Sequence, residues 1–527
     1  MIAKNTAKKI LGDLPLTAEL YWLLRQNNEP PVGGYRLDRL QAYLPQWLEQ
    51  AQVARQSVER PKRVLVFSML SYWLEHSLLM SIALAALGHD VTLTYLPHAH
   101  WKKHINRFDL RRQNLYIQDI VEKAQPLIKT LSLFDAPQAR LLPAELAEQM
   151  PAAAFRDTQY SLLREEIYPD SDLYHLRQAR NEIHARRMLA RMETAPPDVV
   201  IVPNGSILEF GITFRVARYL DIPVSTFEFG EQNDRMWLAQ NDDVMRQDTS
   251  LLWNVRKDTP LIEDEWKRVR EFFAARQKGN LWETFVRLWQ GTPARGGEQA
   301  RHELGLDSRP VVMLPTNVLG DSLTLGRQYF SRSMTEWLKR TIEFFIERPD
   351  VQFVIKTHPG ELIGWGPAVY DIIQEMFPNL PENIHLLAAD AKVNAYDLVQ
   401  IADVGLVFTT TMGMEMAMSG LPVIVTGKTH YRGKGFTLDP DTWEAFSEIL
   451  TNVLADPQGH RPTRPQVEAA WTYAYRFFFE YPQPYPWHIQ HFGEDIQRWP
   501  LEKILSEEGL AIFGKSFDYL LGKPIEW

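Results

Sequence analysis

The chain has 527 residues, with 57 Lys and Arg against 66 Asp and Glu, and no cysteine. Its formal net charge of −9 argues against a long polyanion such as a nucleic acid as the main partner. The lack of cysteine excludes disulfides and thiolate-bound metals and favours a reducing compartment. Because single hydrophobic cores stop growing at roughly 250 to 300 residues, this length predicts more than one domain.

The N-terminal region shows no export signal. Residues 1–24 lack a sustained apolar core followed by a cleavage site of small residues. No apolar run in the chain approaches the roughly 20 residues that a membrane span needs. We therefore expect a cytoplasmic protein without a transmembrane segment.

The first half predicts a helical extension followed by a β-α-β unit. Residues 1–60 have helical character, and RVLVFSML (63–70) is a short apolar run typical of a buried parallel strand. LEHSLLMSIALAALG (74–88) then predicts a helix ending at a glycine, and HDVTLTYLP (89–97) a second strand. Further strands are expected at DVVIVPNG and IPVSTFEFG. Residues 61–290 are thus predicted to be a Rossmann-like domain, with a long helical insertion over 100–195.

The second half repeats this alternation. Gly, Pro and charged residues are mixed over 291–310, which predicts an interdomain linker. Five strand-like runs separated by helical patterns follow, and they predict a second Rossmann-like domain over 311–470: PVVMLPTN, VQFVIKTHPG, NIHLLAAD, VGLVFTTT and LPVIVTG. The aromatic tail over 471–527 is expected to pack across the domains. The predicted class is therefore α/β with two Rossmann-like domains.

One motif suggests a nucleoside triphosphatase, and the residues around it exclude that interpretation. Gly427, Lys428 and Thr429 match the end of a phosphate-binding P-loop. Such a loop needs its first glycine five positions before Gly427, where this chain has Pro422. Proline removes one of the backbone N–H donors that would surround the phosphate.

Ligands of open α/β sheets bind beyond the carboxyl ends of the strands, and several polar clusters are predicted there. KTHPGE, after the strand VQFVI, contains Lys356, His358 and Glu361. The proline restricts His358 to an extended backbone, and Lys356 and His358 alternate onto one side. This pairing suits a phosphate or a leaving-group oxygen; a solvent-exposed turn is the alternative.

A threonine-rich turn follows the strand VGLVF. Thr409, Thr410 and Thr411 precede Gly413 and Glu415 at the start of a predicted helix. Hydroxyls and backbone N–H groups at a helix N-terminus predict an anion site. Glu415 could there accept hydrogen bonds from a ribose diol. Simple N-capping by Thr411 is the alternative.

Two more loops complete the expected binding set. HYRGKGFT contains two glycines, which permit a tight turn that would bring Arg432 and Lys434 close to a ligand. A solvated surface loop is the alternative. PTNVLGDS follows the first strand of this domain, where Asn317 and Gly320 line the interdomain cleft or merely turn the chain.

These motifs resemble a known family. A second α/β half with KTHPGE and then TTTMGMEMAMSGLPVI resembles the GT-B glycosyltransferases, and HYRGKGFT is similar to the bacterial capsule polysaccharide biosynthesis branch. The resemblance covers mainly residues 310–440. It implies two Rossmann-like domains facing a central cleft, and transfer of a sugar from a CMP- or UDP-linked donor to a glycan or lipid-linked acceptor. No metal or cofactor is implied, and peripheral association with the inner face of the membrane is compatible with this function.

The resemblance also implies roles for individual residues. In related sialyltransferases and Kdo-type transferases, a His-Pro motif and a hydroxyl-rich turn both meet the donor phosphate. His358 maps to the first, as a catalytic residue, and Thr409–Thr411 to the second. This chain has threonines where those families often have serines, and its first half has no clear copy of their acidic-pair-glycine motif.

The proton acceptor of the reaction is expected in the first domain. Transfer with inversion needs a base within hydrogen-bond reach of the acceptor hydroxyl. His76 in SYWLEHS titrates near neutrality without help, and Glu231 and Asp234 in EFGEQNDR lie on a glycine-containing loop. The choice between the histidine and the two carboxylates stays open.

Three histidines in LPHAHWKKH raise the question of a metal site. The spacing of His98, His100 and His104 matches no familiar site, and no carboxylate accompanies them. We expect exposed loop histidines and no metal.

Two other functions share the predicted architecture. One is a nucleotide-sugar epimerase of the UDP-N-acetylglucosamine 2-epimerase type, which would convert a donor without an acceptor. The other is a non-catalytic component that binds a sugar nucleotide or a polysaccharide. A dehydrogenase is disfavoured because no G-x-G-x-x-G follows a predicted strand.

Overall fold

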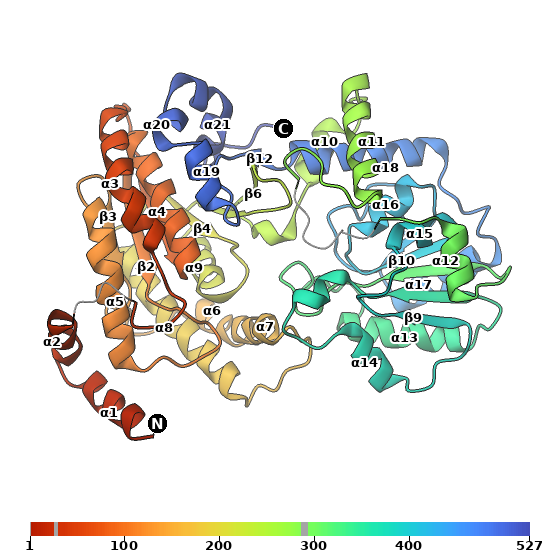
Figure 1. Ribbon diagram of the computed structural model, residues 1–527, viewed down its shortest axis with the longest axis horizontal. Helices are drawn as coiled ribbons and strands as arrows, with labels where there is room; N and C mark the ends of the chain where they lie inside the picture. The colour runs from red at the N-terminus through yellow and green to blue at the C-terminus, as the bar shows by residue number, and fades with distance from the viewer. Residues whose placement is uncertain (1, 26–29, 286–292) are drawn as a thin grey trace. The chain divides into compact units, whose positions relative to one another are not determined.

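Two separate β-sheets organise the chain, as the computed structural model in Figure 1 shows. The structure describes residues 2–25, 30–285 and 293–527. The chain divides into two units of interleaved segments. The first unit contains Met1–Thr158, Tyr168–Met245 and Gln483–Glu526, and the second contains Gln159–Ile167, Arg246–Pro482 and Trp527.

The first unit is built on a seven-stranded sheet of order β12-β6-β5-β4-β1-β2-β3. The strands are β1 (Arg63–Met69), β2 (Asp90–Leu96), β3 (Lys129–Ser132), β4 (Val199–Pro203), β5 (Val224–Glu228), β6 (Arg235–Gln240) and β12 (Gln483–Pro484). The run from β3 to β5 is parallel, whereas β6 and β12 pair antiparallel at the edge. The central strands are buried almost throughout, which explains their continuous apolar sequences.

Helices of the first unit cover this sheet, and others form an extension at the N-terminus of the chain. They are α1 (Ile2–Asp13), α2 (Thr17–Leu24), α3 (Asp38–Val53), α4 (Ser71–Ala86), α5 (Arg107–Val121), α6 (Ala144–Ala147), α7 (Met150–Leu162), α8 (Asp172–Thr194), α9 (Leu208–Tyr219), α19 (Phe492–Arg498), α20 (Leu501–Ile504) and α21 (Glu507–Leu520). The last turn of α7, from residue 159, belongs to the second unit. Helices α1 and α2 pack on α5, and α3 packs on α4 and α20. The predicted N-terminal extension is thus helical, and it forms part of the first unit.

The second unit contains a five-stranded parallel sheet of order β11-β10-β7-β8-β9. Its strands are β7 (Val311–Pro315), β8 (Gln352–Lys356), β9 (Ile384–Leu387), β10 (Val404–Val407) and β11 (Val423–Val425). All five coincide with predicted runs. In each unit the parallel strands have the order 3-2-1-4-5 when counted along the chain, which is the Rossmann order. The predicted α/β class with two Rossmann-like sheets is confirmed.

Helices of the second unit alternate with these strands or follow them. They are α10 (Ser250–Arg256), α11 (Glu263–Gln277), α12 (Gly297–Leu304), α13 (Met334–Ile346), α14 (Val369–Met376), α15 (Ala395–Ile401), α16 (Met412–Met418), α17 (Trp443–Ala455) and α18 (Arg464–Tyr475). Short helical turns occur at η1 (Glu122–Ala124) in the first unit, at the junction η2 (Val244–Arg246), and at η3 (Pro359–Ile363) and η4 (Arg476–Glu480) in the second.

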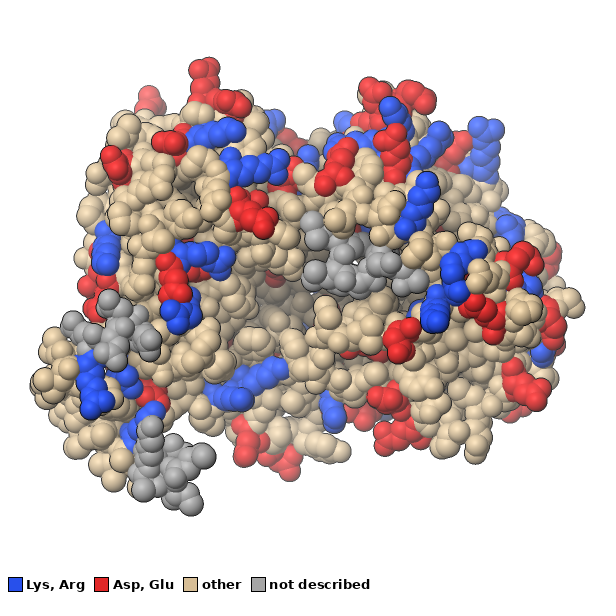
Figure 2. Space-filling model, in the orientation of Figure 1, with Lys and Arg blue, Asp and Glu red and all other residues tan. Residues whose placement is uncertain are grey.

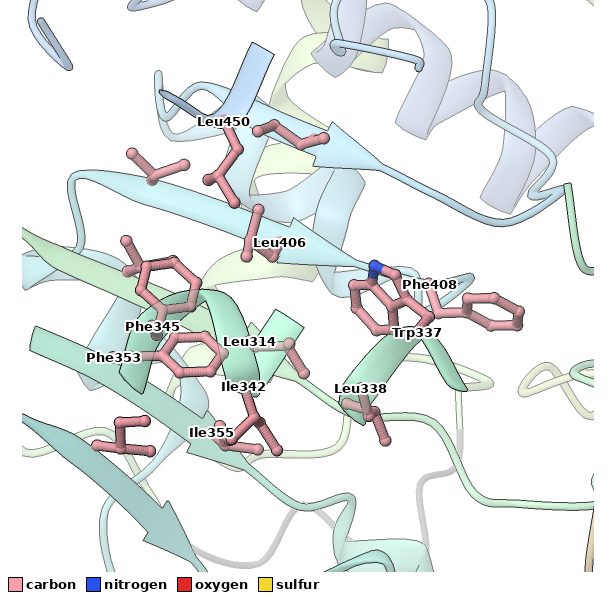
Figure 3. Close-up of a cluster of buried hydrophobic side chains, with 14 of the residues drawn as sticks. Leu314, Trp337, Leu338, Ile342, Phe345, Phe353, Ile355, Leu406, Phe408 and Leu450 are labelled. Carbon is pink, nitrogen blue, oxygen red and sulfur yellow. The ribbon is translucent and has the colours of Figure 1, made fainter. Parts of the chain in front are cut away.

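The core of the second unit shows why α13 forms where it does. Its apolar residues recur at helical spacing, and Trp337, Ile342 and Phe345 are fully buried against the sheet (Figure 3). Phe345 stacks on Phe353 of β8 at a centroid distance of 4.1 Å. Trp337 lies 5.7 Å from the ring of Phe408, which follows β10. This core therefore holds α13 against β8 and against the carboxyl end of β10.

The boundary between the units differs from the sequence-based one. The structure divides the chain near residue 245, whereas the sequence predicted a linker over 291–310. Residues 291 and 292, and 286–290 before them, lie outside the described residues. The rest of the predicted linker belongs to the second unit, because α12 packs on α15 and Asp397 accepts the backbone N–H groups of Arg295 and Gly296. Of the aromatic tail, residues up to 482 belong to the second unit and 483–526 to the first.

The surface mixes both signs of charge. On the face shown in Figure 2, Lys and Arg side chains are interspersed with Asp and Glu. Within the described ranges, the structure contains no helix that is both long and apolar enough to cross a membrane.

Candidate functional site

The centre of the second sheet brings the predicted polar loops together. Strands β7 and β10 are neighbours, and the connections from them leave toward opposite sides of the sheet, which makes their carboxyl ends the topological switch point. Two consecutive residues after β7 hold the two other loops. Thr316 accepts the backbone N–H of His358 at 3.2 Å, and Asn317 accepts that of Thr409 at 3.1 Å. The His-Pro loop and the threonine turn thus converge on one point.

His358 is fixed in one tautomer. Its Nδ1 accepts the N–H of Gly360 at 3.0 Å and caps the short helix η3. An accepting Nδ1 carries no proton, so in the neutral ring the proton is on Nε2, which acts as a donor. Burial, with a smaller effect of the Lys356 charge, lowers the pKa of His358 to about 4. Near neutral pH this histidine is therefore an uncharged N–H donor.

The close approach of Gly360 supports this arrangement. A Cβ at this position would lie 2.8 Å from His358 Nδ1, so a larger residue would displace the imidazole. Glycine at position 360 lets the backbone N–H reach the imidazole without this clash. Neither this constraint nor the tautomer follows from the sequence motif alone.

Lys356 and Glu361 lie close to His358 in the sequence, and their hydrogen bonds hold the loop after β8 in place. Lys356 is 6% exposed, and its Nζ donates to the carbonyl of Ala388 at 2.8 Å, tying the end of β8 to the loop after β9. Burial lowers its pKa to about 8. Burial also raises the pKa of Glu361 to about 7, although its Oε1 accepts the N–H of Val369. The site thus holds two groups that titrate close to neutral pH.

The threonine turn presents an unused polar group. Thr409 Oγ1 is buried and has no hydrogen-bond partner among the described residues. The hydroxyl of Thr410 accepts weakly from the N–H of Met412 at 3.4 Å. Thr411 makes no side-chain cap to α16, so the alternative of simple N-capping by Thr411 is not what the structure shows. A buried hydroxyl without a partner at a strand end marks a place where a ligand atom would restore a hydrogen bond.

Gly413 is a packing residue of this turn. A Cβ on it would lie 2.3 Å from the hydroxyl oxygen of Tyr431, and that hydroxyl donates to the carbonyl of Thr410 at 2.6 Å. The hydroxyl of Tyr431 therefore holds the threonine turn in place, and the absence of a side chain on Gly413 leaves room for Tyr431. Sequence reasoning passed over Tyr431, although it lies in the HYRGKGFT motif.

Glu415 does not face a ligand, which corrects the expectation that it binds a ribose. It is 4% exposed, and both carboxylate oxygens have partners. Arg276 Nη2 donates to Oε1 at 2.7 Å, and the Tyr396 hydroxyl donates to Oε2 at 2.6 Å. The carboxylate thus joins α11, α15 and α16 through a buried ion pair.

Arg432 is also engaged inside the protein. Its guanidinium donates to the carbonyls of Val425, Asp439 and Pro440 and lies 4.2 Å from the ring centre of Tyr329. The guanidinium therefore stabilises its own loop, and few of its N–H groups remain to bind a phosphate. Lys434 is partly buried, which lowers its pKa, and the charge of Asp248 opposes that change. The predicted pair of cationic ligands is thus reduced to Lys434.

In the first unit the structure disfavours His76 as the base. The residue is fully buried, and its Nε2 lies 3.1 Å from the carbonyl oxygen of Trp487. Its ring is surrounded by five aromatic side chains: Trp73, Phe227, Phe229, Tyr485 and Phe492. Burial lowers its pKa to about 3. A ring without exposed surface cannot reach an acceptor hydroxyl in this conformation.

Glu231 and Asp234 lie in the turn between β5 and β6. This turn follows the carboxyl end of β5, as predicted, but it leads into an antiparallel strand and not into a helix. Both residues are partly exposed, and Asp234 Oδ1 is buried without a hydrogen-bond partner in the described chain.

A segment from the first half of the sequence supports the site loops of the second unit. Backbone atoms of Leu163 lie within 3 Å of where a Cβ on Gly320 would be, and its side chain packs equally closely against Gly366. Glu165 accepts the N–H groups of Met334 and Thr335 at 2.8 and 2.7 Å and so caps α13. These long-range contacts had no signal in the local sequence.

The comparisons with known proteins agree with the resemblance read from the motifs. Residues 287–452 match the family of capsule polysaccharide biosynthesis proteins, and this segment includes every residue of the site in the second unit. The resemblance expected from KTHPGE and the threonine turn is confirmed. No curated protein matches the sequence.

Several solved structures are similar in fold. The β-Kdo 2,4-transferase KpsC of Thermosulfurimonas dismutans is 18% identical over 55% of this chain and 81% of its own, with a TM-score of 0.35. The β-Kdo 2,7-transferase KpsC of the same organism is 12% identical over 70% and 89%, with a TM-score of 0.33. The UDP-GlcNAc 2-epimerase of Neisseria meningitidis is 12% identical over 79% and 100%, with a TM-score of 0.25. Likenesses this distant say nothing about substrate or activity.

Proposed function

We propose that this chain is a glycosyltransferase of capsule polysaccharide biosynthesis that binds the nucleotide of its sugar donor at the switch point of the second sheet. The family match over 287–452 supports the pathway. The observation that carries the proposal is the convergence of His358 and Thr409 on Thr316 and Asn317. The donor is a nucleotide-activated sugar, CMP- or UDP-linked, and the acceptor is a glycan or a lipid-linked glycan.

The site would stabilise a leaving phosphate without a metal. Nε2–H of His358 and the hydroxyls of Thr409, Thr410 and Thr411 are fixed donors at a strand end, and Lys356 adds positive charge beside them. Donors that are already oriented stabilise charge that develops on a phosphate oxygen, because they need not reorganise during the reaction. Direct displacement at the sugar carbon then passes the electron pair of the broken bond to that phosphate.

Each residue acts according to its surroundings. His358 donates a hydrogen bond and does not transfer a proton, because its pKa of about 4 keeps it neutral and its Nδ1 is occupied. Asn317 holds the threonine turn, and Lys356 and Glu361 hold the loop after β8. Gly413 makes room for Tyr431, while Arg432 and Glu415 support neighbouring helices and loops. Lys434 is left as the cation that could meet the outer part of the donor.

Two substitutions at one position test the proposal. His358→Asn keeps an acceptor close to Nδ1 for the N–H of Gly360 but removes the Nε2 donor. His358→Gln keeps a donor close to Nε2 and loses the acceptor. The assay is thermal stabilisation by CMP, UDP and their sugar conjugates.

We expect one nucleotide class to stabilise the wild type, and His358→Asn to bind it at least about tenfold more weakly with an unchanged melting temperature in the absence of ligand. His358→Gln should bind better than His358→Asn while melting lower. Equal nucleotide affinity in the wild type and His358→Asn would contradict the proposed role, and the lack of any stabilising nucleotide would contradict the proposed donor site.

A further inference from the structure

Exposed apolar side chains gather on the first two helices of the first unit. Of the 24 large apolar side chains that are exposed in the described chain, eight lie within residues 10–24. We call them the N-terminal apolar face: Ile10, Leu11, Leu14, Leu16, Leu20, Tyr21, Leu23 and Leu24. Single exposed apolar residues are normal on a protein surface, whereas a cluster of this kind marks a surface that binds something.

Helix α2 is apolar on two opposite sides. Ala18 and Trp22, four residues apart, are buried, and Nε1 of Trp22 donates to Asp119 of α5 at 2.8 Å. Leu20, Leu23 and Leu24 lie on the other side of the helix, where they are 56%, 66% and 83% exposed. Helix α5 therefore covers only one apolar side of α2 (Figure 1). A helix that is apolar all round is normally covered all round.

The turn between α1 and α2 continues the N-terminal apolar face. Leu14 and Leu16 in this turn are 47% and 64% exposed, and Ile10 near the end of α1 is 59% exposed. The hydroxyl of Thr17 donates to the carbonyl of Leu14 at 3.1 Å and holds the turn against α2. The face thus extends from the end of α1 over the turn to the end of α2.

The charge around this face is opposite to that of the whole chain. Residues 2–25 and 101–112 contain nine Lys and Arg against three Asp and Glu, a net charge of +6, which leaves −15 for the rest. The two segments are in contact, because a Cβ on Gly12 would lie 2.7 Å from the backbone N of Phe108 and 3.2 Å from Cβ of Arg107. On the face shown in Figure 2, Lys and Arg gather at the lower left, where Figure 1 places α1 and α2.

Carboxylates close to the face have partners inside the protein. Glu19 of α2 pairs with Arg111, and Asp109 of α5 pairs with Lys8 at 2.6 Å. These pairs fix the buried sides of α1 and α2 to α5. The exposed cations beside the face are Lys9, Arg25 and Arg107, and Asp13 is exposed among them. The exposed charge beside the apolar residues is therefore mainly positive.

We propose that α1 and α2 attach the protein to an anionic lipid bilayer through the N-terminal apolar face. This inference does not depend on the proposed transferase activity. Helix α2 has eight residues and is about 12 Å long, so it lies in the interface and does not span a hydrocarbon core of about 30 Å. Helices of this kind insert an apolar side at the boundary between headgroups and acyl chains, while Lys and Arg beside it attract anionic headgroups.

The charge also disfavours a second copy of the chain as the occupant. In a symmetric dimer the same surface patch of both subunits would meet, so two regions of charge +6 would lie against each other. An anionic bilayer neutralises these cations, and its acyl chains cover exposed Leu and Ile side chains without a complementary groove.

Sedimentation with lipid vesicles tests the proposal on the full chain. One set of vesicles contains equal parts of phosphatidylglycerol and phosphatidylcholine, and the other contains phosphatidylcholine alone. The variant Leu23→Asp/Leu24→Asp changes the apolar face, and Lys9→Gln/Arg107→Gln changes the charge. Val53→Asp is the matched control, because Val53 is 85% exposed at the end of α3 and lies outside the face.

We expect the wild type to bind the anionic vesicles, and added salt to weaken this binding. Leu23→Asp/Leu24→Asp should bind at least about tenfold more weakly with an unchanged melting temperature. Each removed cation should weaken binding roughly fivefold at low salt. Val53→Asp should match the wild type, and phosphatidylcholine alone should bind less protein.

Three results would overturn the proposal. The first is that the wild type does not bind the anionic vesicles. The second is that Leu23→Asp/Leu24→Asp and Lys9→Gln/Arg107→Gln both bind them as tightly as the wild type. The third is that the wild type is a dimer without vesicles and Leu23→Asp/Leu24→Asp is a monomer, which would assign the face to a second copy.

Discussion

Replacing Glu415 with glutamine separates a structural role from a ligand-binding one. The carboxylate accepts from Arg276 at 2.7 Å and from Tyr396 at 2.6 Å, and it is 4% exposed. The arginine also lies over the rings of Phe272 and Phe478, at 5.1 and 5.3 Å from their centres. Glu415→Gln would leave the guanidinium buried without its counter-charge. Breaking such a pair costs about 3 to 5 kcal/mol.

The expected effect is large enough to measure by heating. In a unit of about 250 residues, each kcal/mol lowers the melting temperature by roughly 2 to 4 °C, so Glu415→Gln should melt roughly 6 to 20 °C lower. Differential scanning calorimetry measures this shift, with Glu448→Gln as a control because Glu448 is exposed on α17. The control should change stability by less than about 0.5 kcal/mol.

A different result would restore the interpretation made from the sequence. If Glu415→Gln melted like the wild type but lost nucleotide binding, Glu415 would bind the ribose and the structural account would be refuted. We expect the reverse: a lower melting temperature and, at temperatures where the variant is folded, nearly unchanged nucleotide affinity.

Three further predictions concern the second unit. Gly360→Ala should displace the ring of His358 and weaken nucleotide binding about tenfold with little loss of stability, as titration calorimetry would show; unchanged binding would mean that the ring has room to move. The pKa of Glu361 is about 7 in the folded protein, against an ordinary value of 4.5. Its contribution to stability is therefore fully present below pH 4.5 and is lost as the pH rises through 7. Glu361→Gln should flatten the dependence of the melting temperature on pH over this range, and identical pH profiles for the wild type and the variant would refute the pKa shift. Glu165→Ala should cost about 0.5 to 2 kcal/mol in urea unfolding, because the N–H groups of Met334 and Thr335 at the start of α13 lose their acceptor, and a loss near zero would show that water replaces it.

The sequence alone predicts the strands of the second unit and the strand ends at which the candidate site lies. The five runs of the second unit are dominated by apolar residues, as is typical of buried parallel strands. The position of KTHPGE and of the threonine turn at the strand ends then followed from the rule that ligands bind there. The family match over 287–452 covers the same residues.

The direction of each side chain could not be predicted in the same way. Glu415 and Arg432 are polar residues near the site, yet each is directed into the protein by partners distant in sequence, such as Arg276 for Glu415. His76 lies after a strand, as a base might, but five aromatic rings from several elements surround it. Local patterns give the position of a residue along its element, whereas its partners depend on tertiary packing.

The local sequence pattern also did not predict that segments of the two units alternate along the chain. Residues 159–167 belong to the second unit although the chain on both sides belongs to the first. The clearest evidence for this is the contact of Leu163 with Gly320, which joins positions more than 150 residues apart. The expectation that His98 is an exposed loop histidine is wrong for a related reason. Its side chain is only 13% exposed, and its Nδ1 lies 3.4 Å from Oε1 of Glu209, which follows a different strand.

The measurement that tests the central claim most directly is a ³¹P NMR time course of the protein with CMP- and UDP-activated sugars. The account predicts that one donor slowly releases free nucleotide, and that an acceptor glycan accelerates this release. Conversion of the donor into a second nucleotide sugar without release of nucleotide would contradict glycosyl transfer and identify an epimerase.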